Sequence, residues 1–137
     1  MLKKRLRDFA DRSGASAVEF ALVASILITL VMGIIEFSLV LYTYTEAGSA
    51  TRDVARRIAT GRLVSTNAQS EVRAQLPTWV RNWANVTANQ TTPGTAATNQ
   101  ITVTVTFPAS KATPTTYLGF AYGSLTLTNT TTMQQEI

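Results

Sequence analysis

The sequence predicts an α+β fold, in which a long N-terminal transmembrane helix continues into an amphipathic helix. A small globular part with one or two further helices and an antiparallel β pair follows. Three observations predict this fold. Residues 15–44 are predominantly apolar and carry no charges except two glutamates, small residues then recur at helical spacing from Ala47 to Ala59, and residues 101–107 alternate between apolar side chains and threonine. These patterns are typical of a membrane span, an amphipathic helix and a half-buried strand.

The apolar stretch, residues 15–44, is long enough to cross a membrane. About 30 residues of helix span roughly 45 Å, the thickness of a bilayer with its headgroups. Five basic residues precede the stretch: Lys3, Lys4, Arg5, Arg7 and Arg12. No comparable cluster directly follows it. By the positive-inside rule, we expect residues 1–14 to be cytoplasmic, residues 15–44 to span the membrane and residues 45–137 to lie outside the cytoplasm.

The two acidic residues of the stretch differ in depth. Glu36 falls near the outer boundary of the bilayer, where an interfacial carboxylate is the simpler interpretation. Glu19 lies about one turn inside the inner boundary, where a carboxylate costs up to a few kcal/mol unless it is neutralised or paired. It either reaches back to the headgroups, is protonated, or finds a cationic partner. We expect both residues to act as membrane charges in assembly, Glu19 above all.

Four residues at the start of the stretch carry a family resemblance: Gly14, Ala15, Glu19 and Phe20, preceded by the basic leader. They resemble the cleavage signature of type IV prepilins, and most closely that of TadE-like minor pseudopilins of tight-adherence (Tad/Flp, type IVc) pilus systems. The resemblance continues through residues 33–37 and 46–52, and thinly at residues 133–136. Ala24 and Ser25 stand where the family usually has a proline. The resemblance implies that a prepilin peptidase cuts between Gly14 and Ala15.

Such a cut has a physical consequence for Glu19. It removes the basic leader and creates a positively charged amine on Ala15, one helical turn from Glu19. That amine can pair with Glu19 of the same or a neighbouring chain, so docking of subunits would satisfy both charges. The resemblance thus implies a structural subunit that assembles, primes or tips a pilus from the bacterial inner membrane. Its implied partners are the prepilin peptidase, other pilins and minor pseudopilins, the inner-membrane assembly platform and the lipid bilayer.

Other functions find little support in the composition. The chain has no histidine or cysteine, which removes the commonest general base and the commonest metal ligands, and we expect no enzyme activity, cofactor or metal site. The net charge of +4 is concentrated beside the apolar stretch, so anionic lipid explains it better than nucleic acid does. The alternative is an uncleaved single-pass anchor whose loops at residues 87–100 and 109–123 bind a ligand or surface.

In the globular part, Gly61 is expected to stop the long helix. Ser65, Thr66 or Asn67 could cap a second helix that Pro77 ends. Trp79, Val80 and Trp83 have helical spacing and are expected to supply core. Residues 87–100 are expected to form a loop, and two strands are expected at residues 101–107 and about 125–133.

The polar side of the amphipathic helix carries one spaced ion pair. Asp53 and Arg57 stand four residues apart with the acid first, which is the favourable order in a helix. We expect this pair to describe a solvated face.

Overall fold

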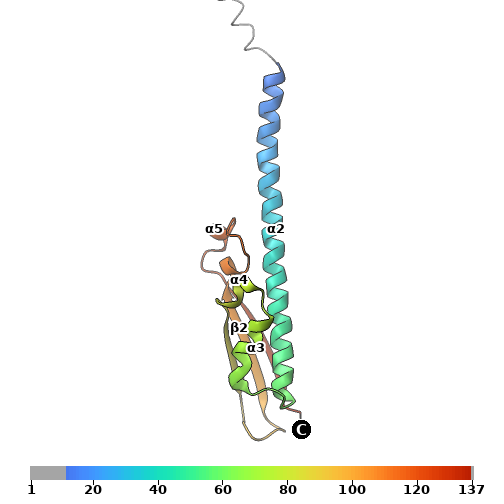
Figure 1. The fold of residues 1–137 in the computed structure, drawn as a ribbon, viewed down its shortest axis with the longest axis vertical. Coiled ribbons are helices and arrows are strands. Elements are labelled where there is room, and N and C mark those ends of the chain that lie inside the picture. The colour runs from blue at the N-terminus through green and yellow to red at the C-terminus, as the bar shows by residue number, and fades with distance from the viewer. Residues whose placement is uncertain (1–11, 137) are drawn as a thin grey trace, which may run out of the picture. The chain divides into compact units, whose positions relative to one another are not determined.

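The computed structural model describes residues 12–136 (Figure 1). One long helix, α2, runs from Arg12 to Ala59. It is followed by the short 3-10 helix η2 (Ser65–Asn67), the helices α3 (Ala68–Gln75) and α4 (Thr78–Arg81), and the strands β1 (Asn85–Gln90) and β2 (Gln100–Pro108). The chain ends with η3 (Ala109–Lys111), α5 (Gly119–Tyr122) and β3 (Thr126–Gln134). The predicted α+β class is confirmed. The basic residues at positions 3–7 lie outside the described residues.

The chain divides into two units, residues 1–35 and residues 36–137. In the first, the described residues form the N-terminal part of α2. In the second, the C-terminal part of α2 packs with the remaining helices and strands around one core.

Helix α2 ends where the sequence predicts. Gly61 has a φ of 70°, a left-handed conformation that glycine adopts without a Cβ penalty. Its backbone N–H donates to the carbonyl of Ile58 (3.0 Å), and the next N–H, that of Arg62, donates to the carbonyl of Arg57 (2.8 Å). These two bonds form a Schellman motif, which satisfies carbonyls that the helix end leaves unpaired.

The buried face of α2 is a regular stripe. Its members recur three or four residues apart and are all less than one-tenth exposed: Glu36, Val40, Thr43, Ala47, Ala50, Val54 and Ile58. Small residues dominate the middle of the stripe and allow the sheet to approach the helix closely. At Gly48, an added Cβ would lie 3.2 Å from Oδ1 of Asn129 in β3. The Asn129 Nδ2 in turn donates to the Tyr44 carbonyl of α2 (3.0 Å).

The sheet has three antiparallel strands in the order β1-β2-β3. In the central strand, Ile101, Val103, Val105 and Phe107 are buried, and they share one core cluster with α2, α3 and α4. The intervening threonines are partly exposed on the other face, where three of them pair across to β3. Hydroxyl groups lie 3.0 Å apart in Thr102–Thr132, 3.2 Å in Thr104–Thr130 and 3.4 Å in Thr106–Thr128. The predicted β2 and β3 strands and their antiparallel pairing are therefore confirmed.

Strand β1 corrects the sequence-based expectation of a loop over residues 87–100. Residues 85–90 pair with residues 101–106 of β2 throughout. Val86 and Ala88 are the only apolar residues on its inward face, so the apolar alternation is too short to mark a strand. The strand exists because it pairs with β2 and packs against α3, neither of which is visible in the local pattern. The loop is shorter than predicted and occupies residues 91–99.

Helices α3 and α4 lie where the sequence predicts helices, but some of their side-chain contacts differ from the prediction. Asn67 occupies the N-cap of α3, one of the three expected positions, but its side chain makes no capping bond. Pro77 follows the end of the helix, as predicted, and Leu76 just before it is buried. In α4, Val80 is buried and the half-buried Trp79 packs on the core. Trp83 contradicts the prediction, because it is mostly exposed and lies under Lys111 Nζ, 4.6 Å from the ring centroid.

Candidate functional site

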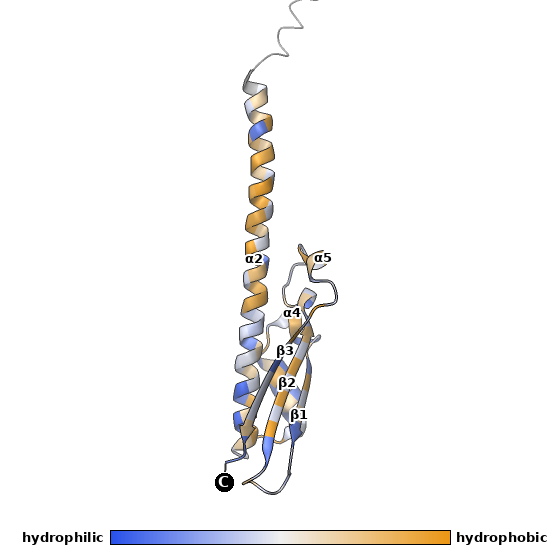
Figure 2. Cartoon of the chain, turned by 180° about the vertical axis from the view of Figure 1, so that it is seen from behind, coloured by the Kyte–Doolittle hydropathy of each residue, from blue (hydrophilic) through white to orange (hydrophobic). Residues whose placement is uncertain are grey.

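The N-terminal part of α2 presents apolar side chains to its surroundings. Val18, Phe20, Leu22 and Val23 are each more than half exposed, and large apolar side chains remain exposed as far as Ile35. Figure 2 shows this part of α2 coloured predominantly as hydrophobic, whereas polar residues become frequent near its C-terminal end. An exposed apolar surface of this extent is unfavourable in water. From Gly14 to Ala59, α2 is long and apolar enough to be a single-pass membrane anchor.

The predicted processing residues lie together at the start of this exposed stretch. Gly14, Ala15, Glu19 and Phe20 are all exposed, and Phe20 is 74% exposed. In the part of the chain that the structure describes, no atom beyond the neighbouring residues and the backbone of α2 lies within 4 Å of the position that a Cβ on Gly14 would take. Among the described residues, the ion pairs involve Arg57 and none involves Glu19. The arrangement leaves these four residues accessible to another protein.

Glu36 lies in a different environment from Glu19. It is only 2% exposed and begins the buried stripe of α2. Its Oε2 accepts a hydrogen bond from the backbone N–H of Leu118 (2.6 Å), and its Oε1 lies 3.3 Å from the Thr113 hydroxyl. The Thr113 hydroxyl also contacts the carbonyl oxygen of Thr115. A short N–H to carboxylate bond of this kind is stronger than a bond between neutral groups. Glu36 therefore holds residues 113–118 against α2.

A second polar contact fastens the same segment two helical turns further along α2. The Thr43 hydroxyl donates to the Ala112 carbonyl (2.6 Å), and the indole Nε1 of Trp79 donates to that carbonyl as well (3.0 Å). Tyr122 lies beyond the segment, and burial raises its pKa, with the negative charge of Glu36 adding to the effect. Residues 112–118 are thus attached to α2 through groups that the sequence alone did not connect.

Removing the Glu36 carboxylate should loosen this attachment. We expect Glu36→Leu to leave the Leu118 N–H unsatisfied, at a cost of about 1–3 kcal/mol. Hydrogen exchange of the Leu118 amide should then speed up about tenfold or more, while exchange in β2 stays unchanged. The matched control is Glu36→Gln, which keeps an oxygen acceptor in place and should exchange more slowly than Glu36→Leu. Equal protection in Glu36→Leu and the natural protein would show that the bond does not hold the segment.

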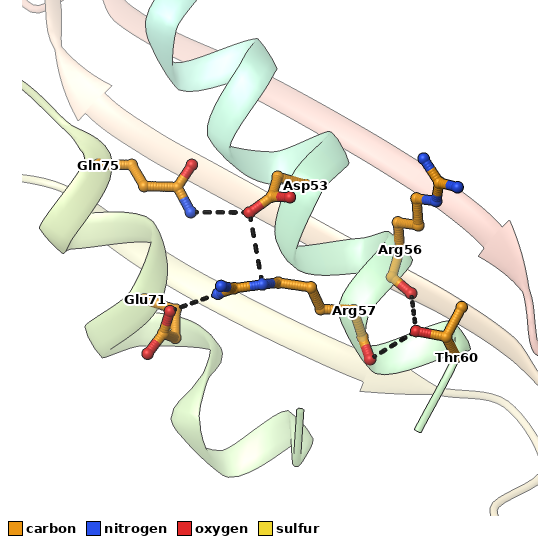
Figure 3. Close-up of polar contacts among 6 residues, drawn as sticks. All are labelled: Asp53, Arg56, Arg57, Thr60, Glu71 and Gln75. Atoms are coloured by element: carbon orange, nitrogen blue, oxygen red, sulfur yellow. Dashed lines mark hydrogen bonds and ion pairs between the residues drawn. The ribbon is translucent and has the colours of Figure 1, made fainter. Parts of the chain in front are cut away.

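The far end of α2 carries a second polar cluster (Figure 3). The predicted Asp53–Arg57 pair is present, with Arg57 Nε 3.7 Å from Asp53 Oδ2. Arg57 also reaches α3, where its Nη1 lies 2.6 Å from Glu71 Oε2, and Gln75 Nε2 donates to Asp53 Oδ2 (3.0 Å). The expected solvated face is thus partly used to tie α3 to α2. Because these side chains are about half exposed, the pairs contribute little stability, about 1 kcal/mol or less each.

Within residues 12–136, no group of three or more acidic, histidine or cysteine side chains could hold a metal ion. Two regions carry the predicted site residues: the exposed apolar stretch of α2 with Glu19, and the contact between Glu36 and residues 113–118.

Comparison with known proteins adds one decisive observation. Residues 14–56 match the model of the TadE-like protein family. This TadE-like segment begins at Gly14 and contains Glu19, Phe20 and Glu36, so the predicted resemblance is confirmed over this range. It associates the chain with Tad pilus systems, whose TadE-like proteins are structural. No curated protein and no solved structure matches the chain.

The match covers Glu19 and Glu36 on α2 but not residues 113–118, which Glu36 holds. The TadE-like segment covers the apolar stretch and most of the buried stripe of α2, but none of the sheet. The attachment at Glu36 was missed by sequence reasoning, which placed this residue at the membrane interface. The spacing of residues 36, 40, 43, 47, 50, 54 and 58 could have revealed that Glu36 shares a face with core positions.

Proposed function

We propose that the chain is a minor pseudopilin, a non-catalytic structural subunit that serves the assembly, priming or tip of a Tad/Flp type IV pilus. The observation that carries this proposal is the TadE-like segment, which begins at Gly14, the residue expected to precede the cut. The exposed apolar surface of α2 supports it, because such a surface needs either lipid or other helices around it.

Maturation is the first step of the proposed mechanism. A prepilin peptidase cuts between Gly14 and Ala15, both of which are exposed. The cut releases the basic residues that hold the N-terminus on the cytoplasmic side of the inner membrane. Without them, α2 can leave the bilayer for an assembly of helices. Residues 45–137 lie in the periplasm in this scheme.

Charge pairing is the second step. In lipid, an unpaired Glu19 carboxylate is energetically costly, and pairing with a cation lowers this cost. The new amine of Ala15 lies about 6 Å along the helix axis from Glu19, so the pair can form within one chain or between neighbours. Other pilins and minor pseudopilins, together with the assembly platform, provide the neighbours.

The N-terminal residue of the protein in its native membrane tests this proposal. We expect mass spectrometry of the membrane-extracted chain to find a mature form that begins at Ala15. The control is expression of the chain in cells that lack a prepilin peptidase, which should yield the uncut chain. A native form that still begins at Met1 would contradict the pilin scheme and favour the uncleaved, membrane-anchored interaction module.

A further inference from the structure

The segment that is held against α2, residues 112–118, and the residues that follow it carry exposed aromatic and apolar side chains. Phe120 is 84% exposed, Leu125 is 55% exposed and Tyr117 is 50% exposed. Residues 112–135 contain no charged side chain. Water-soluble surfaces seldom gather apolar side chains without charges among them, so this composition indicates a contact with something apolar.

The place where the segment is attached suggests what that contact is. Leu118 is bonded to Glu36, which directly follows Ile35, the last residue of the exposed apolar stretch. About 20 residues of helix cross the hydrocarbon core, so a span that starts near Ser16 ends near residue 36. The segment is therefore attached at the level along α2 where the outer boundary of the bilayer is expected.

An apolar groove of about 250 Å³ lies between α2 and the residues that follow the segment. It is lined by Phe37, Leu41 and Tyr44 on one side and by Tyr122, Leu125 and Leu127 on the other. Phe37 and Leu41 are themselves about half exposed. Tyrosine suits the boundary of a bilayer, because its ring is apolar and its hydroxyl can reach water.

We propose that residues 117–125 form a second membrane contact, which lies in the outer interfacial layer of the bilayer that α2 crosses. Phe120 and Leu125 enter the acyl-chain boundary, and Tyr117 lies among the headgroups. The Glu36 carboxylate fixes the depth of this contact by holding Leu118. This inference rests on the membrane anchoring in the proposed function, and it assigns to the periplasmic part a lipid contact that a simple anchor does not need.

Site-specific labelling can test the proposal, because the natural chain has no cysteine. Three single-cysteine variants of the full chain would carry an environment-sensitive fluorophore: Phe120→Cys, Ile28→Cys and Thr95→Cys. Ile28 lies in the exposed apolar stretch, and Thr95 lies in the exposed loop between β1 and β2. Each labelled protein is reconstituted into vesicles of phosphatidylethanolamine and phosphatidylglycerol with and without spin-labelled lipid, which quenches nearby fluorophores.

We expect spin-labelled lipid to reduce the fluorescence at Phe120→Cys and at Ile28→Cys by roughly half or more, and to leave Thr95→Cys nearly unchanged. Adding Glu36→Leu to Phe120→Cys should reduce the quenching at position 120. The proposal is overturned if Ile28→Cys is quenched and Phe120→Cys behaves like Thr95→Cys, a result that leaves the anchor intact. If Ile28→Cys is not quenched either, the membrane anchoring itself fails.

A second copy of the chain is the competing occupant of this surface. Pyrene attached at Phe120→Cys reports it, because two pyrenes in contact emit as an excimer. We expect no excimer emission when the protein is diluted in excess lipid. Excimer emission that persists on dilution, together with weak quenching by spin-labelled lipid, would assign the surface to contacts between copies and overturn the lipid proposal.

Discussion

Replacing Gly14 by leucine is expected to leave the precursor uncut and to abolish the pilus. The proposed peptidase must accept the residue before the cut, and a branched side chain there would obstruct it. The substitution itself should not disturb the fold, because no described residue outside the adjacent helix backbone comes within 4 Å of the new Cβ position, and leucine favours helix more than glycine does. The mass of the membrane-extracted protein and the amount of surface pili measure the two effects.

The matched control for Gly14→Leu is Ala21→Leu, which makes a similar change at an exposed position of the same helix but outside the cleavage pair. It should be cut normally. If Gly14→Leu were cut as efficiently as Ala21→Leu, or if the uncut chain still supported normal pili, maturation at this position would not be part of the function.

Replacing Glu19 by alanine is expected to separate cutting from assembly. The variant should begin at Ala15 like the natural mature form, since the scissile pair is intact. Assembly should fall about tenfold or more, because the terminal amine loses the carboxylate with which it forms an ion pair in a medium of low dielectric. Immunoblots of pili sheared from cells measure assembly, and the mass of the membrane form measures cutting.

Two further variants show whether charge is the cause. Glu19→Gln keeps the size of the side chain and removes its charge, so it should fail like Glu19→Ala. Glu19→Asp keeps the charge on a shorter side chain and should retain part of the assembly. Normal pili from Glu19→Gln would show that the role of charge pairing is wrong, even if the residue proved important for another reason.

The long helix illustrates how much a local pattern can predict. The apolar stretch, the continuation to Ala59 and the stop at Gly61 all follow from hydropathy, spacing and the conformational freedom of glycine. The strand at residues 100–108 can likewise be predicted from its local pattern, because four apolar residues alternate with threonine. These features depend on interactions within a few residues, so the sequence is sufficient to find them.

Other features were hidden because their cause lies far away in the chain. Strand β1 contains only two inward-facing apolar residues and is stabilised by its ladder with β2. Trp83 has the spacing of a core residue, yet the helix it was assigned to ends at Arg81, so that spacing no longer applies. In both cases a local pattern was weaker than a tertiary contact or a chain turn.

The sequence by itself determined the membrane-length helix and its end, because hydrophobicity and helical period act locally. The residues of the proposed cleavage site rest instead on the family resemblance. Only the tertiary structure decided the role of Glu36. The sequence places this glutamate near the boundary of the bilayer but does not reveal the backbone N–H that it binds, which belongs to Leu118, 82 positions away. Burying a carboxylate requires such a donor, and only the folded chain brings the donor to it.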